Sequence, residues 1–103
     1  MSALMIVHLT ISDERWMKDY FATVPSLLAE YGAATVAGSK DIKRIEGVMP
    51  VPDRMSVIQF PSIEAIEKFM GDDRYAPWIV KRHEGAAAEI FIFENAMTSG
   101  PLA

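Results

Sequence analysis

The chain has 103 residues, a length typical of one domain, and its formal net charge is −4. Its ten basic residues are scattered, without a basic stripe among aromatics, which argues against a nucleic-acid partner; the absence of cysteine excludes disulfides, thiolate metal sites and a cysteine nucleophile. No hydrophobic run approaches the ~20 residues of a membrane span, and the N-terminus lacks a signal-like stretch, so we expect no membrane partner and a cytoplasmic protein.

The first predicted element is a buried strand at residues 3–11, ALMIVHLTI, which is short, apolar and rich in β-branched residues. Alternation divides this strand into two faces. The apolar face consists of Met5, Val7, Leu9 and Ile11, and the more polar face consists of Leu4, Ile6, His8 and Thr10.

A helix is predicted next, because apolar residues repeat at steps of three and four over residues 16–31. Ser12 or Asp13 can cap its start. Pro25 lies inside the stretch and predicts a kink or a restarted turn, and Gly32 predicts the stop.

Two strands and a loop follow. Residues 34–38, ATVAG, form a weaker second strand that IKRIE at 42–46 could extend, and residues 47–53 form a glycine- and proline-rich loop. The third strand is RMSVIQF at 54–60, where Gln59 is a lone polar residue near the end of an apolar run.

The second helical region begins near Ser62 and is interrupted by GDD at 71–73. A second piece covers about residues 74–84, and alternating EIFIFE at 89–94 forms the last strand. The order β-α-β-β-α-β predicts an α+β, ferredoxin-like sandwich with helices on one face of its sheet. We assign residues 1–97 to this single domain and 98–103 to a flexible tail.

Helices on one side leave the other face of the sheet bare, and we call this the free face. Its predicted members include Ile6, Met55 and Val57 beside His8 and Gln59, which is too apolar for water. Half of the residues are hydrophobic, which is rich for a small monomer. We therefore expect a homodimer whose sheets meet face to face, with Gln59 pointing into the enclosed space.

The same residues carry a family resemblance that covers nearly the whole chain in order. The matching segments are DERWMKDYFATVPSLLAEYG, RIEG at 44–47, RMSVIQFPSIEAIEKF, DDRYAPWIVKR at 72–82 and IFIFEN. The chain resembles the family called domain of unknown function 1330, within the dimeric α+β barrel superfamily. The resemblance implies a homodimer, and related members of that superfamily include cofactor-independent monooxygenases, haem-degrading enzymes, isomerases and dehalogenation-type enzymes.

The chain departs from the family pattern at four positions. Gln59 stands where the family usually carries Glu, Phe69 where a Trp is common, Ala33 at the second glycine of a Tyr-Gly-Gly motif, and Asn95 at the usual terminal Gly. Gln59 cannot titrate, so an acid or base role of that glutamate would be lost here.

His8 is the candidate catalytic residue, because imidazole gains and loses a proton near neutral pH. A hydrogen-bonded interior histidine is the alternative. Gln59 could orient a substrate carbonyl, or it could be a structural amide that ties strands together.

Tyr75, Trp78 and Arg82 share one helix face and are the other candidate ligand-binding residues. Arg82 could clamp a carboxylate through two parallel hydrogen bonds. Its alternatives are a snorkelling side chain or an ion pair with Glu46, Asp72 or Glu94.

Other constellations are weaker. Trp16, Tyr20, Phe69 and Trp78 could wall a pocket but have the helical spacing of core residues. His83 with Glu84, or Asp72 with Asp73, lacks the converging ligands of a zinc site, so we predict no metal.

The sequence thus predicts a small-molecule-binding homodimer, without a cofactor, that could be a cofactor-independent enzyme of oxygenase or isomerase type. Its site would lie between the free face and the second helix. A non-catalytic binding or interaction module with a small or filled cavity is the alternative. A haem-handling protein, with His8 or His83 as axial ligand, is the third hypothesis.

Overall fold

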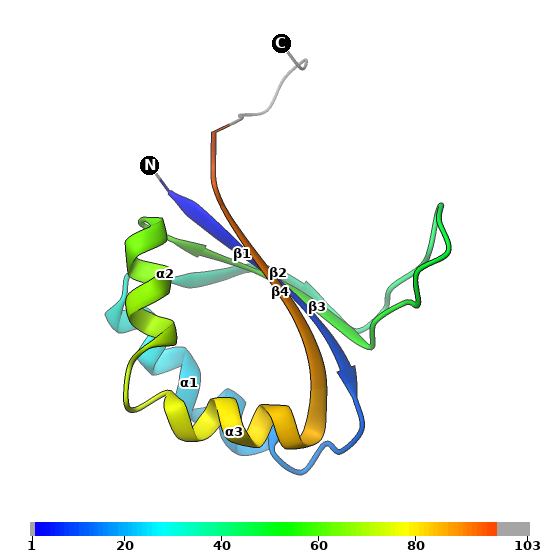
Figure 1. The fold of residues 1–103 in the computed structure, drawn as a ribbon, viewed down its shortest axis with the longest axis horizontal. Coiled ribbons are helices and arrows are strands. Elements are labelled where there is room, and N and C mark those ends of the chain that lie inside the picture. The colour runs from blue at the N-terminus through cyan, green and yellow to red at the C-terminus, as the bar shows by residue number, and fades with distance from the viewer. Residues whose placement is uncertain (1, 97–103) are drawn as a thin grey trace.

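The computed structural model describes residues 2–96, and the tail predicted at 98–103 lies outside the described residues. The elements follow the predicted order, with the second helical region divided in two. They are β1 (Ala3–Ile11), α1 (Met17–Glu30), β2 (Ala34–Ser39), β3 (Arg54–Phe60), α2 (Ile63–Met70), α3 (Ala76–Gly85) and β4 (Ala86–Glu94). Figure 1 shows all three helices on one side of the sheet, which confirms the predicted α+β architecture.

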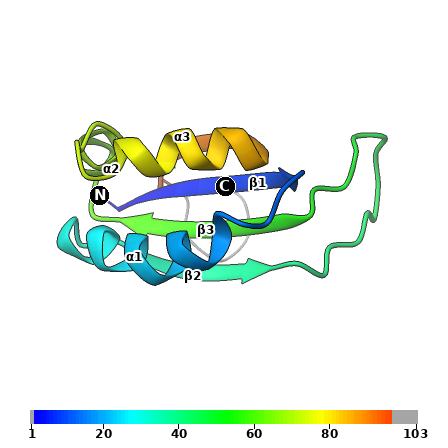
Figure 2. The ribbon, with the colours of Figure 1, turned by 90° about the horizontal axis from the view of Figure 1, so that it is seen from below.

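The four strands form one antiparallel sheet in the order β2-β3-β1-β4. β1 pairs with β3 on one side and β4 on the other, so that Ile6 lies between Val57 and Phe91. The sheet is not closed, and β2 and β4 are its two edges. Figure 2, seen from below, shows α1 and α3 lying along these strands.

The helix-facing side of the sheet carries the core. Side chains at alternate positions of β1, beginning with Ala3 and Met5, are buried against the helices together with Phe60 of β3. Val24 of α1 and Ile66 of α2 are the helical residues packed most deeply against them, each 1% exposed. The predicted division of β1 into two faces is therefore correct.

Helix α1 begins later than its predicted caps. Its first helical residue is Met17, whereas the Asp13 carboxylate accepts hydrogen bonds from the backbone and side chain of Arg15 and is not a cap. Of the kink or restarted turn predicted at Pro25, the restarted turn is wrong, since one helix continues through that exposed residue and water can bond the carbonyl that proline leaves free. The predicted stop is correct, because Gly32 has a φ of 71°.

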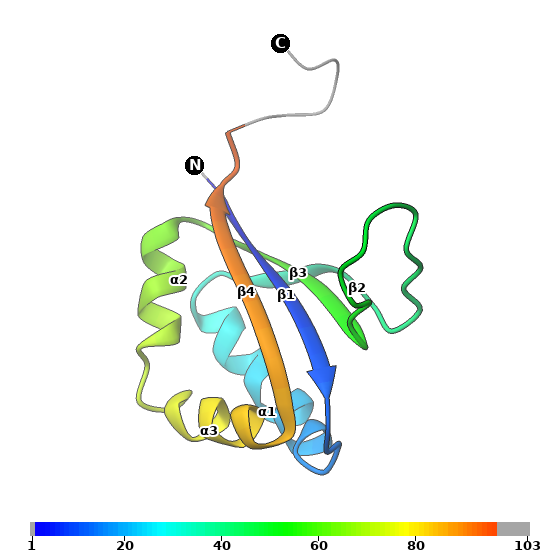
Figure 3. The ribbon, with the colours of Figure 1, turned by 45° about the vertical axis from the view of Figure 1, so that its right-hand side comes forward.

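The strand extension predicted at residues 42–46 is wrong. Residues 40–53 form a long loop, here called the arm, which Figure 3 shows projecting from the ends of β2 and β3. Its apolar side chains have no strand to pair with and lie in solvent, with Ile45 99% and Val48 94% exposed. Asp53 fixes the end of the arm, because its carboxylate accepts the Ile11 N–H at 2.7 Å and its own N–H donates to the Leu9 carbonyl at 2.8 Å.

The second helical region is divided at Gly71, as the sequence predicts. Ser62 caps α2 by accepting a hydrogen bond from the Ala65 N–H at 3.1 Å. Strand β4 begins three residues before its predicted start, at Ala86, because small residues there pair with the end of β1.

Candidate functional site

The five residues predicted from the sequence lie on two sides of the sheet. His8 and Gln59 belong to the free face, where they pair in register with Met55 and Leu4. Tyr75, Trp78 and Arg82 belong to α3 or its N-cap, on the helical side. Because the sheet separates the two sets, no single cavity of one subunit contains all five. The predicted location between the free face and the second helix is therefore wrong, since every helix covers the opposite face.

A cavity of about 550 Å³ lies between the helices and the sheet. Most of its wall is apolar. The apolar lining includes Met5 and Leu9 of β1, Ile58 of β3, Trp16 before α1, and Val24 and Leu28 of α1. The apolar stripe of α1, which sequence analysis interprets as core, therefore also forms part of a cavity wall.

Arg82 is the buried charged group of this cavity, and its side chain is 4% exposed. Within the described chain its Nε has no hydrogen-bond partner. The alternative of an ion pair with Glu46, Asp72 or Glu94 is wrong, since Arg82 forms no salt bridge within the described residues. The Asp72 carboxylate instead binds Arg74 at 2.9 Å and accepts the Tyr31 hydroxyl at 2.5 Å. The snorkelling alternative is wrong as well, since the guanidinium is buried and does not reach solvent.

A pair of tyrosines accompanies the arginine. The hydroxyl oxygens of Tyr20 and Tyr75 are 2.6 Å apart and both side chains line the cavity. Burial raises the pKa of the Tyr20 hydroxyl far above its ordinary value, the neighbouring Tyr75 adds to this rise, and Arg82 opposes it. The Tyr20 hydroxyl thus keeps its proton at neutral pH and is not a base. Sequence analysis named Tyr20 only as a possible aromatic wall residue, because its spacing fits the apolar stripe of α1.

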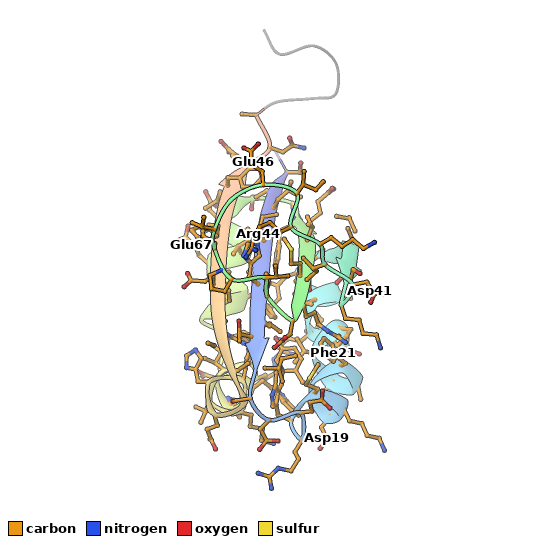
Figure 4. All side chains as sticks on the ribbon, turned by 90° about the vertical axis from the view of Figure 1, so that its right-hand side faces the viewer. Asp19, Phe21, Asp41, Arg44, Glu46 and Glu67 are labelled. Carbon is orange, nitrogen blue, oxygen red and sulfur yellow. The ribbon has the colours of Figure 1, made fainter. Side chains whose placement is uncertain are left out.

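Two further cations line the cavity from the side of β2 and β3. They are Lys40, at the start of the arm, and the half-buried Arg54. The Arg54 guanidinium lies 5.1 Å from the centroid of the Phe21 ring, which Figure 4 labels on α1. Sequence reasoning missed both residues, since neither belongs to an apolar stripe and only the packing of α1 on the sheet brings them to the cavity.

Trp78 does not line this cavity. It borders a separate hollow between α3 and the start of α1, and the Lys81 ammonium lies 4.5 Å from its ring centroid. Its edge also faces Tyr20, with ring centroids 6.0 Å apart. Trp16 and Phe69 from the same predicted aromatic set do line the cavity, and Phe69 stacks at 4.3 Å on Tyr75.

The free face is apolar and largely uncovered in the single chain. β4 adds Phe91 and Phe93 to it, 59% and 47% exposed. The His8 ring contacts Phe91 edge to face, with centroids 6.5 Å apart, and Gln59 is exposed. The enclosure predicted for Gln59 therefore depends on a second molecule. Alternation in EIFIFE was the signal that could have placed both phenylalanines on this face.

The described residues bring no three histidine, cysteine or carboxylate side chains together as a metal site. Within residues 2–96, no helix has the length and apolar character needed to cross a membrane.

Comparison with known proteins places the chain in a family. The sequence model described as "Domain of unknown function (DUF1330)" matches residues 2–96, and no curated protein matches the chain. Among solved structures, RPA0582, a protein of unknown function from Rhodopseudomonas palustris, has a TM-score of 0.79 at 12% identity, covering 89% of this chain and 80% of that chain.

Two further structures are similar over nearly their whole length. SnoaB, a cofactor-independent oxygenase from Streptomyces nogalater, has a TM-score of 0.63 at 13% identity, and the match covers 94% of this chain and 95% of the SnoaB chain. HapK from Hahella chejuensis has a TM-score of 0.62 at 15% identity, with 98% of both chains covered. Both are of the dimeric α+β barrel type, so the predicted fold class is confirmed. At these identities the likeness concerns the fold alone.

Proposed function

Because the chain belongs to the DUF1330 family, whose name assigns no activity, we propose from its own cavity that it is a small-molecule-binding protein. The observation that carries this proposal is the cavity of about 550 Å³ between the helices and the sheet. Pockets that hold drug-sized ligands measure about 300–1,000 Å³ and combine apolar walls with a few polar groups. The cavity has this composition, with Arg82, Tyr20 and Tyr75 among its polar groups.

The lining favours binding over acid–base catalysis by the protein. Among residues 2–96, the cavity wall includes no histidine, aspartate or glutamate, and burial keeps Tyr20 protonated. His8 lies across the sheet, and His83 is exposed on α3, which also argues against haem held in this cavity by either residue.

A cofactor-independent reaction is the second candidate, and the same donors favour it. Arg82 and the tyrosine pair could stabilise negative charge that develops on a substrate oxygen. The substrate proton would then pass to water, since the described cavity wall includes no histidine or carboxylate base. The oxygenase SnoaB supports this candidate only through its similar fold.

Occupation of the cavity can be tested with N-phenyl-1-naphthylamine, a neutral probe whose fluorescence rises in apolar sites. We expect saturable binding by the wild type and its loss in Ser56→Phe, which places a ring into the cavity from β3. Ser26→Phe, on the exposed side of α1, is the matched control and should bind like the wild type. Equal binding by both variants, or no binding by a folded wild type, would contradict the proposal.

We also propose that a second copy of the chain covers the free face. Exposed Phe91 and Phe93 beside Ile6 and Val57 form an apolar surface that is rare on soluble monomers. The arm projects on the same side of the sheet, away from the helices, so a docked copy would also meet its apolar side chains (Figure 1). In Figure 4, Arg44 and Glu46 mark this arm in front of the sheet.

Light scattering tests the dimer. Low micromolar wild type should give about twice the chain mass of 11.5 kDa, because obligate interfaces bury ~2,000 Å² or more. Val57→Asp should dissociate or unfold the dimer. Twofold symmetry would place one unpaired carboxylate from each copy in the buried interface, at a cost of several kcal/mol each. Thr23→Asp, on the exposed side of α1, is the control. A folded wild-type monomer at micromolar concentration would refute the dimer.

A further inference from the structure

The charge of the cavity is opposite to the charge of the chain. The formal net charge is −4, yet the charged residues that line the cavity are Lys40, Arg54 and Arg82, all cationic. No carboxylate within residues 2–96 belongs to the lining. A wall of this kind attracts anions and repels cations.

Arg82 makes the strongest contribution, because its charge is buried. Arginine stays protonated in proteins, and a buried cation without a counter-charge is costly. Its side chain is 4% exposed, its Nε is unpartnered, and it forms no ion pair in the described chain. The missing partner is therefore best supplied from outside the chain.

The second unpartnered donor does not point to a ligand. The Trp16 indole Nε1 also lacks a hydrogen bond, but it lies against Gly85, where an added Cβ would be 2.3 Å from it. The tyrosine pair is different. One hydroxyl proton serves the bond between Tyr20 and Tyr75, so the other remains available to an acceptor in the cavity.

We infer that the ligand is an amphiphilic carboxylate, with an apolar body against the α1 side of the cavity and a single carboxylate bound by Arg82 and the tyrosine pair. This inference rests on the proposed function and adds the chemical class of the ligand. A guanidinium can donate two parallel hydrogen bonds to a carboxylate, and the free Nε of Arg82 is one donor of such a fork.

Two probes that differ only in charge test the inference, namely 1-naphthaleneacetic acid and its neutral amide, measured by calorimetry at pH 7. We expect the wild type to bind the acid about tenfold more tightly or better, as hydrogen bonds to a charged group provide. Arg82→Gln should remove most of this preference, with affinity for the amide unchanged, because only the more exposed Lys40 and Arg54 remain. Lys81→Gln removes a positive charge from the neighbouring, exposed position of α3 and should keep the preference.

The outcomes separate the two proposals. Equal binding of acid and amide by the wild type would overturn the carboxylate but leave the apolar cavity site intact. Binding of neither probe, together with no N-phenyl-1-naphthylamine binding, would overturn both. If Arg82→Gln does not fold, the wild-type ratio and its fall with added salt decide the question, and a ratio of one overturns the inference.

Discussion

Replacement of Gly85 by alanine should destabilise the protein through one crowded contact. Gly85 ends α3, and an added Cβ would lie 2.2 Å from Cδ1 of Trp16 and 2.7 Å from the carbonyl oxygen of Asp13. The backbone there cannot easily withdraw, because the Gly85 carbonyl accepts hydrogen bonds from Ser12 N–H at 2.9 Å and Asp13 N–H at 3.1 Å. Overpacking of this kind costs about 1–3 kcal/mol, against a helix-propensity gain of about 0.5–1 kcal/mol.

The expected net loss is about 1–2 kcal/mol in the free energy of urea unfolding, measured at one fixed protein concentration. Gly71→Ala is the matched control, because its nearest atom would be 3.5 Å away, an ordinary contact. Gly85→Ala should also weaken N-phenyl-1-naphthylamine binding, since Trp16 lines the cavity and has to move. If the two variants unfold at the same urea concentration, Trp16 repacks freely and this account of the α3 end is wrong.

Two other predictions concern the free face and the turn before α3. Leu9→Ala removes a buried core side chain and should cost ~2–5 kcal/mol, whereas His8→Ala should lower the melting temperature far less; equal losses would make the histidine structural. Hydrogen bonds from Arg74 and, to a smaller extent, from Tyr31 lower the pKa of the Asp72 carboxyl. The ionised carboxylate therefore stabilises the fold fully above the unfolded-state pKa near ~3.9. This stabilisation is lost as the pH falls toward the lower pKa of the folded state. The stability advantage over Asp72→Asn should therefore shrink between pH 6 and pH 3, and a constant difference in thermal melts would refute it.

Local pattern was sufficient for most of the fold. Period-two alternation in residues 3–11 assigned both faces of β1, and Gly32 and Ser62 marked helix ends through their own backbone and side-chain chemistry. The prediction failed for IKRIE at 42–46, whose apolar alternation resembles a strand. A strand also needs a neighbour to bond, and β3 begins only at Arg54, so that segment has none.

The candidate site was predictable only in part, for a related reason. The stripe on α3 brought Tyr75 and Arg82 together correctly, since residues on one helix face are set by the helical repeat. The approach of Tyr20 and Arg54 to the same cavity depends on how α1 packs across the sheet. No single segment encodes that packing, so spacing along the chain could not distinguish a cavity wall from a filled core.

Because the cavity lies on the helical side of the sheet, ligand binding and dimerisation through the free face can be tested separately. His8 and Val7 are neighbours in β1, yet they point to opposite faces of the sheet, His8 onto the free face and Val7 into the cavity. The cavity lies between the helices and the core face of the sheet, on the side opposite the free face. From the sequence, a monomer would have contradicted the cavity and the dimer together. With the cavity on the helical side, a folded monomer would refute only the dimer. Carboxylate binding through Arg82 is tested independently, by the calorimetric comparison of the acid with its amide.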